Sequence, residues 1–400
     1  MKNNKDTLIE KTKDIFFEKY KHNPEVLSIS PGRVNIIGEH VDYTLGLSMP
    51  VAIDRYLCVA MSKNSKKTID VYSENLNDSF STRLDEVSNA TELWQKYVQG
   101  SILEALGELL CDTGVDVVIN SNIPMGKGIS SSAALELSVV CSTLKLFNIQ
   151  LNEEEIIDRC QRVDHEHIGI KSGKLDQSAC LLSKKDSVFI IDFSDFSIDY
   201  IPMKLDDVSW VLIDSNVRRE LASSKYHQRV QECEDAFKFL SSKIKNLKNF
   251  RDIDENKCVA VDLLPSKLRK RVLHILSENN RVLSMKDAIK NNLSKKIGAI
   301  LHESHKSLRY NYEVSCEEID FLIERSEELD FWYGGRIMGG GFGGSTINLI
   351  KKGYEEVYIE TICKSYKRKF DIGCESMKIS FVDGAKTIDN IKDLWKSSGH

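Results

Sequence analysis

Residues 132–147 constrain the fold more than any other part of the sequence, because most of their side chains are apolar. The apolar positions are Ala133, Ala134, Leu135, Leu137, Val139, Val140, Leu144, Leu146 and Phe147. A helix that is apolar on most sides is a buried helix. The run is too short to span a bilayer, which needs ~20 apolar residues. We therefore predict a helix buried in a globular core.

Strand and helix patterns lie on both sides of this segment. Apolar runs bounded by turn residues predict strands at 26–30, 34–37, 49–53, 56–60, 115–119, 186–193, 208–214, 345–349 and 377–382. Helical periodicity predicts a helix over 5–21 and dominates residues 216–330. Asn152, followed by three glutamates, is a helix start with acids in the first turn. The chain therefore combines helices and strands.

The length of 400 residues predicts roughly two to three domains. We place a boundary near residue 200, between two predicted strands, which gives domains 1–200 and 201–400. Only 6 prolines and no low-complexity tract argue against long disordered linkers.

Composition excludes several classes of protein. A formal charge of −5 argues against a protein built around nucleic acid or an anionic membrane surface. The amino-terminal residues lack the apolar core of a signal peptide. The ten cysteines are scattered without a Cys-x-x-Cys pair, which is typical of thiols that stay reduced. We therefore expect a cytoplasmic protein without nucleic-acid or membrane partners.

The first motif, residues 30–43, reads Ser-Pro-Gly-Arg-Val-Asn-Ile-Ile-Gly-Glu-His-Val-Asp-Tyr. Glu39, His40 and Asp42 closely follow a short apolar strand. Three ionisable groups beyond a buried strand are costly unless they face each other or a polar ligand. A polyol would suit these acceptors, and a solvated turn is the alternative. One histidine and two acids give only weak support to a zinc site.

The second motif, residues 124–135, places glycines and serines at the entrance to the apolar helix. Backbone N–H groups and the positive end of the helix dipole make such an entrance an anion site. The hydroxyls of Ser130, Ser131 and Ser132 could add contacts to phosphate or Mg²⁺. The motif is not a Walker P-loop, because no Gly-Lys-Ser/Thr closes it. A serine-capped helix after a glycine turn is the alternative.

The third motif, residues 337–346, holds five glycines in six positions before a predicted strand. Such a run predicts backbone that approaches another group closely, although a flexible hinge would look similar.

Two aspartates stand near a predicted helix that begins after Asn152. The inward-facing stripe of that helix is predicted to run through Ile156, Ile157, Cys160, Val163 and His167. Asp164 shares this stripe with Cys160, four residues earlier. A buried carboxylate needs a partner, which a metal ion or a hydrogen-bond donor would supply. Asp176 follows a glycine-containing turn where the chain leaves the helix. The neighbouring His165-Glu-His predicts no metal site, because residues two apart on a helix point away from each other.

Together, the three motifs resemble the signature set of the galactokinase family, in the superfamily that also contains homoserine, mevalonate and phosphomevalonate kinases. Their order and spacing match from about residue 25 to 385. The resemblance implies an α+β fold with an N-terminal ribosomal-protein-S5-domain-2-like domain, a C-terminal ferredoxin-like domain and an active site in the interdomain cleft. It also implies ATP-dependent phosphorylation of the anomeric hydroxyl of galactose with Mg²⁺ as cofactor. The expected partners are a small-molecule sugar and ATP, and the expected state is a monomer.

The resemblance also implies roles for single residues. Asp176, in a segment similar to the family's Gly-x-x-Asp-Gln, would be catalytic together with Arg33. The implied sugar-binding residues are Glu39, His40, Asp42, Gly173 and Tyr226. The implied nucleotide-binding residues are Trp94, Tyr97, Gly126, Lys127, Gly128, Ser130, Ser131, Ser132, Gly340 and Gly341. The implied Mg²⁺ ligands are Ser132 and Asp164.

These roles are chemically coherent. Phosphoryl transfer depends on positioning and on neutralising charge at the transferred group, which Mg²⁺ and helix-entrance amides would do. Asp176 would accept the anomeric proton or orient the hydroxyl, and the sequence leaves both roles open. Arg33 would favour the charged form of Asp176 and stabilise charge in the transition state.

Three departures from the family pattern bear on the substrate and the metal. Tyr43-Thr-Leu-Gly replaces Tyr-Asn-x-Gly, and Asp164 is one methylene shorter than the family glutamate. Ser172-Gly-Lys-Leu-Asp-Gln replaces Cys-Gly-Ile-Met-Asp-Gln and is more similar to the plant galacturonokinase branch.

Kinases for galacturonate, L-arabinose or N-acetylgalactosamine are therefore alternatives, and a non-catalytic galactose sensor is a further one. Glu39 and His40 favour a neutral C6 hydroxymethyl, because a uronate would face the Glu39 carboxylate. The intact serine run and the presence of Asp176 favour an enzyme over a sensor.

Overall fold

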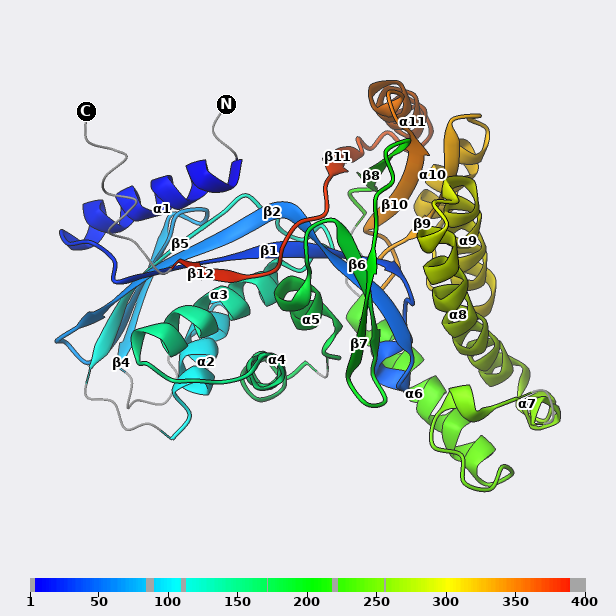
Figure 1. Ribbon diagram of the computed structural model, residues 1–400, viewed down its shortest axis with the longest axis horizontal. Coiled ribbons are helices and arrows are strands. Elements are labelled where there is room, and N and C mark those ends of the chain that lie inside the picture. The colour runs from blue at the N-terminus through cyan, green and yellow to red at the C-terminus, as the bar shows by residue number, and fades with distance from the viewer. Residues whose placement is uncertain are drawn as a thin grey trace. The chain divides into compact units, whose positions relative to one another are not determined.

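The computed structural model describes residues 4–83, 90–108, 113–170, 172–217, 222–254 and 257–388 (Figure 1). Contacts divide the chain into two compact units. The first unit comprises Met1–Arg33, Ala52–Lys185 and Val382–His400, and the second comprises Val34–Val51 and Asp186–Phe381. Residues of the first motif therefore belong to both units. The predicted domain boundary near residue 200 and the predicted site between two domains stay predictions.

The first unit is built on a mixed sheet with the strand order β12-β1-β2-β5-β3-β4. These strands are β1 (Val26–Ile37), β2 (Leu47–Asn64), β3 (Thr68–Ser73), β4 (Asp78–Arg83), β5 (Gly114–Ser121) and β12 (Lys386–Ile388). Helices α2 (Leu93–Leu106), α3 (Ser131–Leu146), α4 (Glu153–Arg162) and α5 (Leu175–Leu182) cover one face, and α1 (Asn4–Tyr20) covers the other (Figure 1). The strands β3 and β5 run parallel, whereas β3 and β4 form an antiparallel pair.

The predicted buried helix is confirmed as α3. Its residues Ala133, Leu137, Val140 and Leu144 are buried and form a core cluster with residues of α2, α4 and α5. The predicted start of α4 is also confirmed, since the Asn152 side chain accepts the backbone N–H of Glu155 at 3.0 Å.

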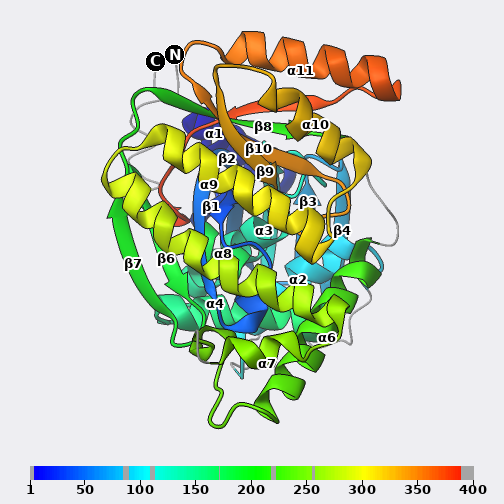
Figure 2. The ribbon, with the colours of Figure 1, turned by 90° about the vertical axis from the view of Figure 1, so that its right-hand side faces the viewer.

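The second unit contains a hairpin, a separate sheet and a group of helices. The hairpin of β6 (Ser187–Asp192) and β7 (Ser197–Pro202) pairs with the start of β2. The antiparallel sheet has the order β11-β8-β10-β9, with β8 (Val208–Asp214), β9 (Trp332–Ile337), β10 (Ser345–Lys351) and β11 (Glu375–Ile379). Helices α8 (Ser266–Lys290) and α9 (Ser294–Ser307) lie side by side (Figure 2), and α9 packs on β9. The other α-helices described in this unit are α6 (Ala222–Ser241), α7 (Cys258–Asp262), α10 (Glu317–Glu327) and α11 (Glu355–Phe370). The predicted α+β fold is thus confirmed.

Between residues 163 and 182 the structure differs from the sequence analysis in two places. Helix α4 ends at Arg162, and Val163–Ile168 forms a π-helical turn instead of continuing the α-helix. A π-helical turn widens the spacing of inward-facing residues, so the α-helical stripe predicted through His167 ends early. The helix α5 was not predicted, and Asp176 lies in its first turn.

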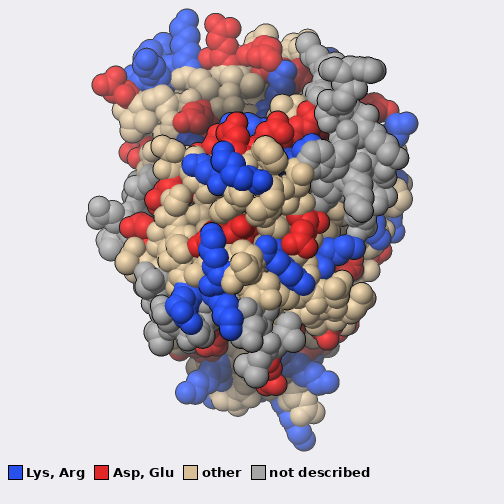
Figure 3. All heavy atoms as spheres, turned by 90° about the vertical axis from the view of Figure 1, so that its left-hand side faces the viewer, with Lys and Arg blue, Asp and Glu red and all other residues tan. Residues whose placement is uncertain are grey.

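The surface carries charges of both signs. On the face shown in Figure 3, basic and acidic side chains are interspersed among the described residues. Within the part of the chain that the structure describes, we find no helix long and apolar enough to cross a membrane.

Candidate active site

Arg33 and Asp176 of the first unit form a two-point ion pair. The Arg33 Nε donates to Asp176 Oδ1 at 2.7 Å, and Nη2 donates to Oδ2 at 2.6 Å. The third nitrogen, Nη1, donates to the carbonyl oxygen of Gly128 at 2.7 Å. Arg33 is nearly buried, whereas 35% of the Asp176 side chain is exposed. The structure therefore brings the two predicted catalytic residues together beside the second motif and leaves the carboxylate accessible.

The second motif adopts a conformation that aims its first serine at the same carboxylate. Ser130 lies in the left-handed region with φ +55°, directly before α3, and its hydroxyl donates to Asp176 Oδ2. The Ser130 side chain makes no cap hydrogen bond to α3. Gly126 and Gly128 also have positive φ and are exposed. The alternative interpretation, a helix capped by a serine side chain, is thus not the arrangement found at Ser130, because its hydroxyl contacts Asp176 instead of the helix.

Asp164 lies in a buried cluster of neutral donors. Its Oδ1 accepts the Tyr97 hydroxyl at 3.2 Å, and its Oδ2 accepts the Ser172 hydroxyl at 2.6 Å and the Gln177 amide at 3.1 Å. The Gln177 amide also donates to the fully buried Glu136 at 3.0 Å. Burial raises the pKa of Asp164, and burial followed by the nearby Asp164 raises that of Glu136.

Sequence reasoning missed Glu136, although a signal was present. A glutamate inside a helix that is apolar on most sides must be buried, and a buried carboxylate needs a partner.

The oxygen atoms near Asp164 suit Mg²⁺. Ser132 lies in the first turn of α3, and the Tyr97 hydroxyl contacts Asp164. Across the described ranges, no group of three or more His, Cys, Asp or Glu could hold a metal ion. Mg²⁺ commonly takes one or two protein oxygens together with water and substrate phosphates. A hydroxyl and a carboxylate therefore fit an ion that arrives with a nucleotide.

The two predicted aromatic residues of the nucleotide site lie in different surroundings. The Trp94 ring of α2 is partly buried and packs edge-on against Phe80, with ring centroids 6.4 Å apart. Tyr97 is buried, and its hydroxyl contacts Asp164. Both nucleotide-binding roles stay predictions.

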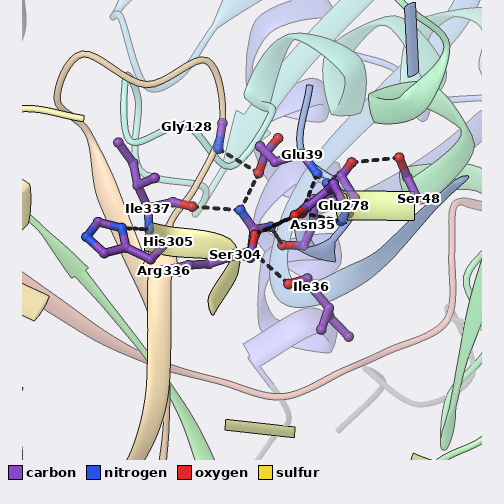
Figure 4. Close-up of polar contacts among 12 residues, drawn as sticks. Asn35, Ile36, Glu39, Ser48, Gly128, Glu278, Ser304, His305, Arg336 and Ile337 are labelled. Atoms are coloured by element: carbon purple, nitrogen blue, oxygen red, sulfur yellow. Dashed lines mark hydrogen bonds and ion pairs between the residues drawn. The ribbon is translucent and has the colours of Figure 1, made fainter. Parts of the chain in front are cut away.

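Glu39 of the second unit is held by a buried arginine that sequence reasoning missed (Figure 4). The fully buried Arg336 donates from Nη1 to Glu39 Oε2 at 2.7 Å, and the backbone N–H of Gly339 donates to the same oxygen at 3.2 Å. Arg336 also donates to the carbonyl oxygens of Asn35 and Ile36, the latter at 2.8 Å. A charged residue at the end of β9, directly before the glycine-rich motif, was the available signal. The first and third motifs are thus in direct contact.

His40 lies among tyrosine side chains. Its Nδ1 is 2.9 Å from the Tyr43 hydroxyl, which is 2.7 Å from the Tyr312 hydroxyl. The ring centroid of Tyr226 is 5.6 Å from that of His40. Burial, with the charge of neighbouring groups, lowers the pKa of His40 to about 3, so its imidazole is neutral at physiological pH. Its buried Nε2 lies beside the backbone of Gly340 and pairs with no side chain among the described residues.

The remaining predicted sugar and nucleotide residues take the following places. Asp42 opens the 3₁₀ turn η1 (Asp42–Thr44) and is partly buried. Gly173 is partly buried and precedes α5. A Cβ at Gly340 would contact the Tyr226 ring at 3.5 Å, and one at Gly341 would lie 2.5 Å from a backbone oxygen. The close approach predicted for the third motif is confirmed at Gly341.

Two family models match the chain. The galactokinase galactose-binding signature matches residues 14–63, and the GHMP kinases N terminal domain matches residues 96–184. The galactokinase of Thermotoga maritima is 36% identical over 359 residues, which cover 90% of this chain and 99% of that protein. The galactokinase of Fusobacterium nucleatum is 33% identical over 377 residues, with coverages of 92% and 97%.

Solved structures agree with these matches. The structure of Lactococcus lactis galactokinase complexed with galactose superposes with a TM-score of 0.88 at 29% identity, over 94% of this chain and 99% of that chain. The mevalonate kinase of Methanococcus jannaschii, at 20% identity and a TM-score of 0.64 over 89% and 98% of the two chains, shares the fold. Since relatives with more than 30% identity match almost from end to end, the chain belongs to the galactokinase family.

Proposed function

We propose that the protein transfers the γ-phosphoryl group of ATP to the anomeric hydroxyl of galactose, giving galactose 1-phosphate and ADP. The observation that carries this proposal is the Arg33–Asp176 pair beside Ser130 at the entrance to α3. The C1 hydroxyl gives its proton to Asp176, and its oxygen forms a bond to the γ-phosphorus. The bond from that phosphorus to the β,γ-bridging oxygen breaks, and ADP leaves.

The nucleotide would bind at the second motif. Backbone N–H groups of the segment from Gly126 to Ser132 and the start of α3 would contact the phosphates. Mg²⁺, held by Ser132 and Asp164 when bound, would neutralise phosphate charge. Lys127, Ser131, Trp94, Tyr97, Gly340 and Gly341 complete the proposed nucleotide site.

The sugar would bind to residues of the first motif together with Gly173 and Tyr226. Neutral His40 can exchange a hydrogen bond with a hydroxyl through Nε2. Arg336 and Gly339 both donate to Glu39 Oε2. The other oxygen, Oε1, is therefore the one that we assign to a sugar hydroxyl.

Galacturonate is a second candidate substrate, because Arg336 compensates the charge of Glu39. The carboxylate of Glu39 alone would repel a uronate, and its buried ion pair with Arg336 weakens that repulsion. We still expect a higher kcat/KM for galactose. A polar group left unpaired by a missing hydroxyl typically costs ~1–3 kcal/mol, which is about 5- to 150-fold.

The test is sugar-dependent release of ADP from ATP and Mg²⁺, measured across galactose, galacturonate, L-arabinose and N-acetylgalactosamine. Phosphorus NMR of the product should show a phosphate on C1. Absence of turnover with every sugar would indicate a sensor, and equal or better activity on galacturonate would contradict galactose as the substrate.

The proposal includes a monomeric enzyme in the cytoplasm. Nine of the ten cysteines lie among the described residues, and none of these nine is in a disulfide, which suits a reducing compartment. Size-exclusion chromatography with light scattering tests the monomer.

A further inference from the structure

Residues 38–46, between β1 and β2, carry Glu39 and His40, and we refer to them as the sugar turn. We propose that Glu278 of α8 is a positioning residue that holds the backbone of the sugar turn and thereby sets the direction of Glu39 and His40. This inference rests on the proposed function for the identity of the ligand. The contact between Glu278 and the turn is independent of that function.

Glu278 accepts two consecutive backbone N–H groups of the sugar turn (Figure 4). Its Oε1 accepts the N–H of Gly38 at 3.0 Å and that of Glu39 at 3.2 Å. The Glu278 side chain is fully buried. The hydroxyl of Ser304 donates to Oε1 at 2.8 Å and lies 3.0 Å from Oε2, while Arg281 Nε donates to Oε2 at 2.7 Å. The carboxylate is therefore held by α8 and α9 and presents one oxygen to the turn.

The backbone of the sugar turn needs such an anchor. Gly38 has φ +88°, and a Cβ there would lie 2.3 Å from the carbonyl oxygen of Leu47. His40 has φ +61°, a region that side-chain-bearing residues seldom adopt. A non-glycine residue stays in this conformation when surrounding contacts impose it. The two hydrogen bonds to Glu278 immediately precede His40 and are contacts of this kind.

Helix α8 makes two further contacts, one to the sugar turn and one to the residue directly after it. His274 Nε2 is 3.0 Å from the carbonyl oxygen of Glu39, and Asn279 Oδ1 accepts the N–H of Leu47 at 2.8 Å. Residues 274 and 278 are four apart and share a face of the helix. One helix thus contacts the beginning of the turn and the first residue after it.

The charge of Glu278 strengthens the anchor. Burial alone would raise the pKa of Glu278, but Arg281, followed by His274 and Arg336, lowers it to about 2. The group is therefore ionised at neutral pH. Hydrogen bonds to an ionised acceptor are shorter and stronger than those to a neutral one. A neutral amide in the same place would hold the two N–H groups more weakly.

The competing view is that Glu278 only stabilises the fold. A stabilising carboxylate would affect the melting temperature and leave sugar affinity unchanged in the enzyme that remains folded. A positioning residue must change the affinity for the sugar specifically, because Glu39 and His40 would sample other directions.

The test is Glu278→Gln, which keeps the size and one acceptor oxygen and removes the charge. We expect the KM for galactose to rise about tenfold or more, with the KM for ATP changed less than twofold. In the enzyme without sugar, the amide hydrogens of Gly38 and Glu39 should exchange with solvent faster. The matched control is Tyr358→Phe, which removes a buried 2.9 Å hydrogen bond to Ser326 between α10 and α11. It should lower the melting temperature without changing the KM for galactose.

Glu278→Gln that melts earlier but keeps the wild-type KM for galactose and the wild-type exchange of both amides would overturn the proposal. If this variant does not fold, Ser304→Ala removes the hydroxyl that orients Glu278, and we expect a two- to threefold rise in the same KM. An unchanged KM in Ser304→Ala would then count against the proposal. If the wild-type protein does not phosphorylate galactose, the proposed function fails, and amide exchange still decides whether Glu278 holds the turn.

Discussion

Two buried carboxylates of the first unit and two of the second differ in their partners. In the first unit, Asp164 and Glu136 contact hydroxyl and amide donors, and within the described ranges no lysine or arginine forms an ion pair with either. In the second unit, Glu278 pairs with Arg281 and Glu39 pairs with Arg336. A buried carboxylate without a positive partner is costly, whereas a paired one is compensated within the protein.

This difference distinguishes the carboxylates that we assign to the reaction from those that we assign to positioning. Glu278 and Glu39 each have an arginine partner within the chain, so they can hold the sugar turn in one conformation. Among the described residues, no lysine or arginine pairs with Asp164 or Glu136, and a Mg²⁺–nucleotide complex would supply a positive partner. Asp176 is intermediate, since Arg33 pairs with it while 35% of its side chain stays exposed.

The largest expected effect is on Asp176. Asp176→Asn keeps the shape and removes the proton acceptor, so kcat should fall by ~10²–10⁴. Binding of ATP and of galactose, measured by calorimetry, should change little, because the asparagine still fills the same space. Retention of more than about a tenth of wild-type turnover would contradict the assignment.

Because Glu39 depends on its arginine partner, we expect substitution of Arg336 to lower the free energy of unfolding strongly. Arg336→Met leaves Glu39 buried without its partner, which should cost about 3–5 kcal/mol of unfolding free energy. Arg33→Met should cost less stability, because Asp176 remains partly exposed to water, but should lower kcat strongly. Denaturant unfolding of both variants is the measurement. Similar stability losses in the two variants would remove the distinction between the units.

Local sequence patterns predicted the elements that local interactions determine. The apolar run defined α3, because burial on all sides needs no information about the rest of the chain. Asn152 predicted the start of α4, because a cap uses only its own first turn. The π-helical turn after Arg162 has no comparable local signature in the sequence, so the stripe predicted through His167 was wrong beyond that point.

The residues that orient the candidate site were not predicted, because their partners are distant in the sequence. Glu278 and Gly38 are 240 residues apart, and Arg336 and Glu39 are 297 apart. A motif states which residue types are present and does not state which side chains will face them. The motif residues were therefore identified from the sequence, whereas Arg336 and Glu278, which hold them, were identified only from the structure.

Acid should destabilise the second unit through its buried histidines. Burial lowers the pKa values of His40, His274 and His305 to about 3, 4 and 3. The unfolded chain protonates these groups near pH 6.5 while the folded chain does not, so stability falls as pH decreases below 6.5. Each histidine contributes up to about 1.4 kcal/mol per pH unit until its folded pKa is reached. Melting temperatures between pH 8 and pH 5 measure this effect. The His305→Asn variant should show a shallower slope, and an equal slope would contradict it.

The smallest expected effect concerns Asp164 and Mg²⁺. Asp164→Ala removes a carboxylate from a cluster that has no positive partner among the described residues. It should therefore raise the Mg²⁺ concentration needed for half-maximal rate, by about tenfold if one charged contact of ~1.4 kcal/mol is lost. Asp164→Glu should be tolerated, because the family carries glutamate at this place and the longer side chain still reaches the ion. Mg²⁺ holds its ligands at ~2.0–2.1 Å and keeps several waters, so the shorter aspartate can act through one of them.

A purely structural Asp164 predicts a different result. The Asp164→Ala variant would lose the hydrogen bonds from Tyr97, Ser172 and Gln177 and melt at a lower temperature. The dependence of rate on free Mg²⁺ would then be unchanged. Ser172→Ala is the matched control, because it removes one of these hydrogen bonds and leaves the carboxylate in place. A shifted Mg²⁺ curve in Asp164→Ala and an unshifted one in Ser172→Ala would assign the ion to the first unit's carboxylates. Two unshifted curves would show that Asp164 is not a metal ligand. The buried carboxylates of the two units would then no longer differ in role.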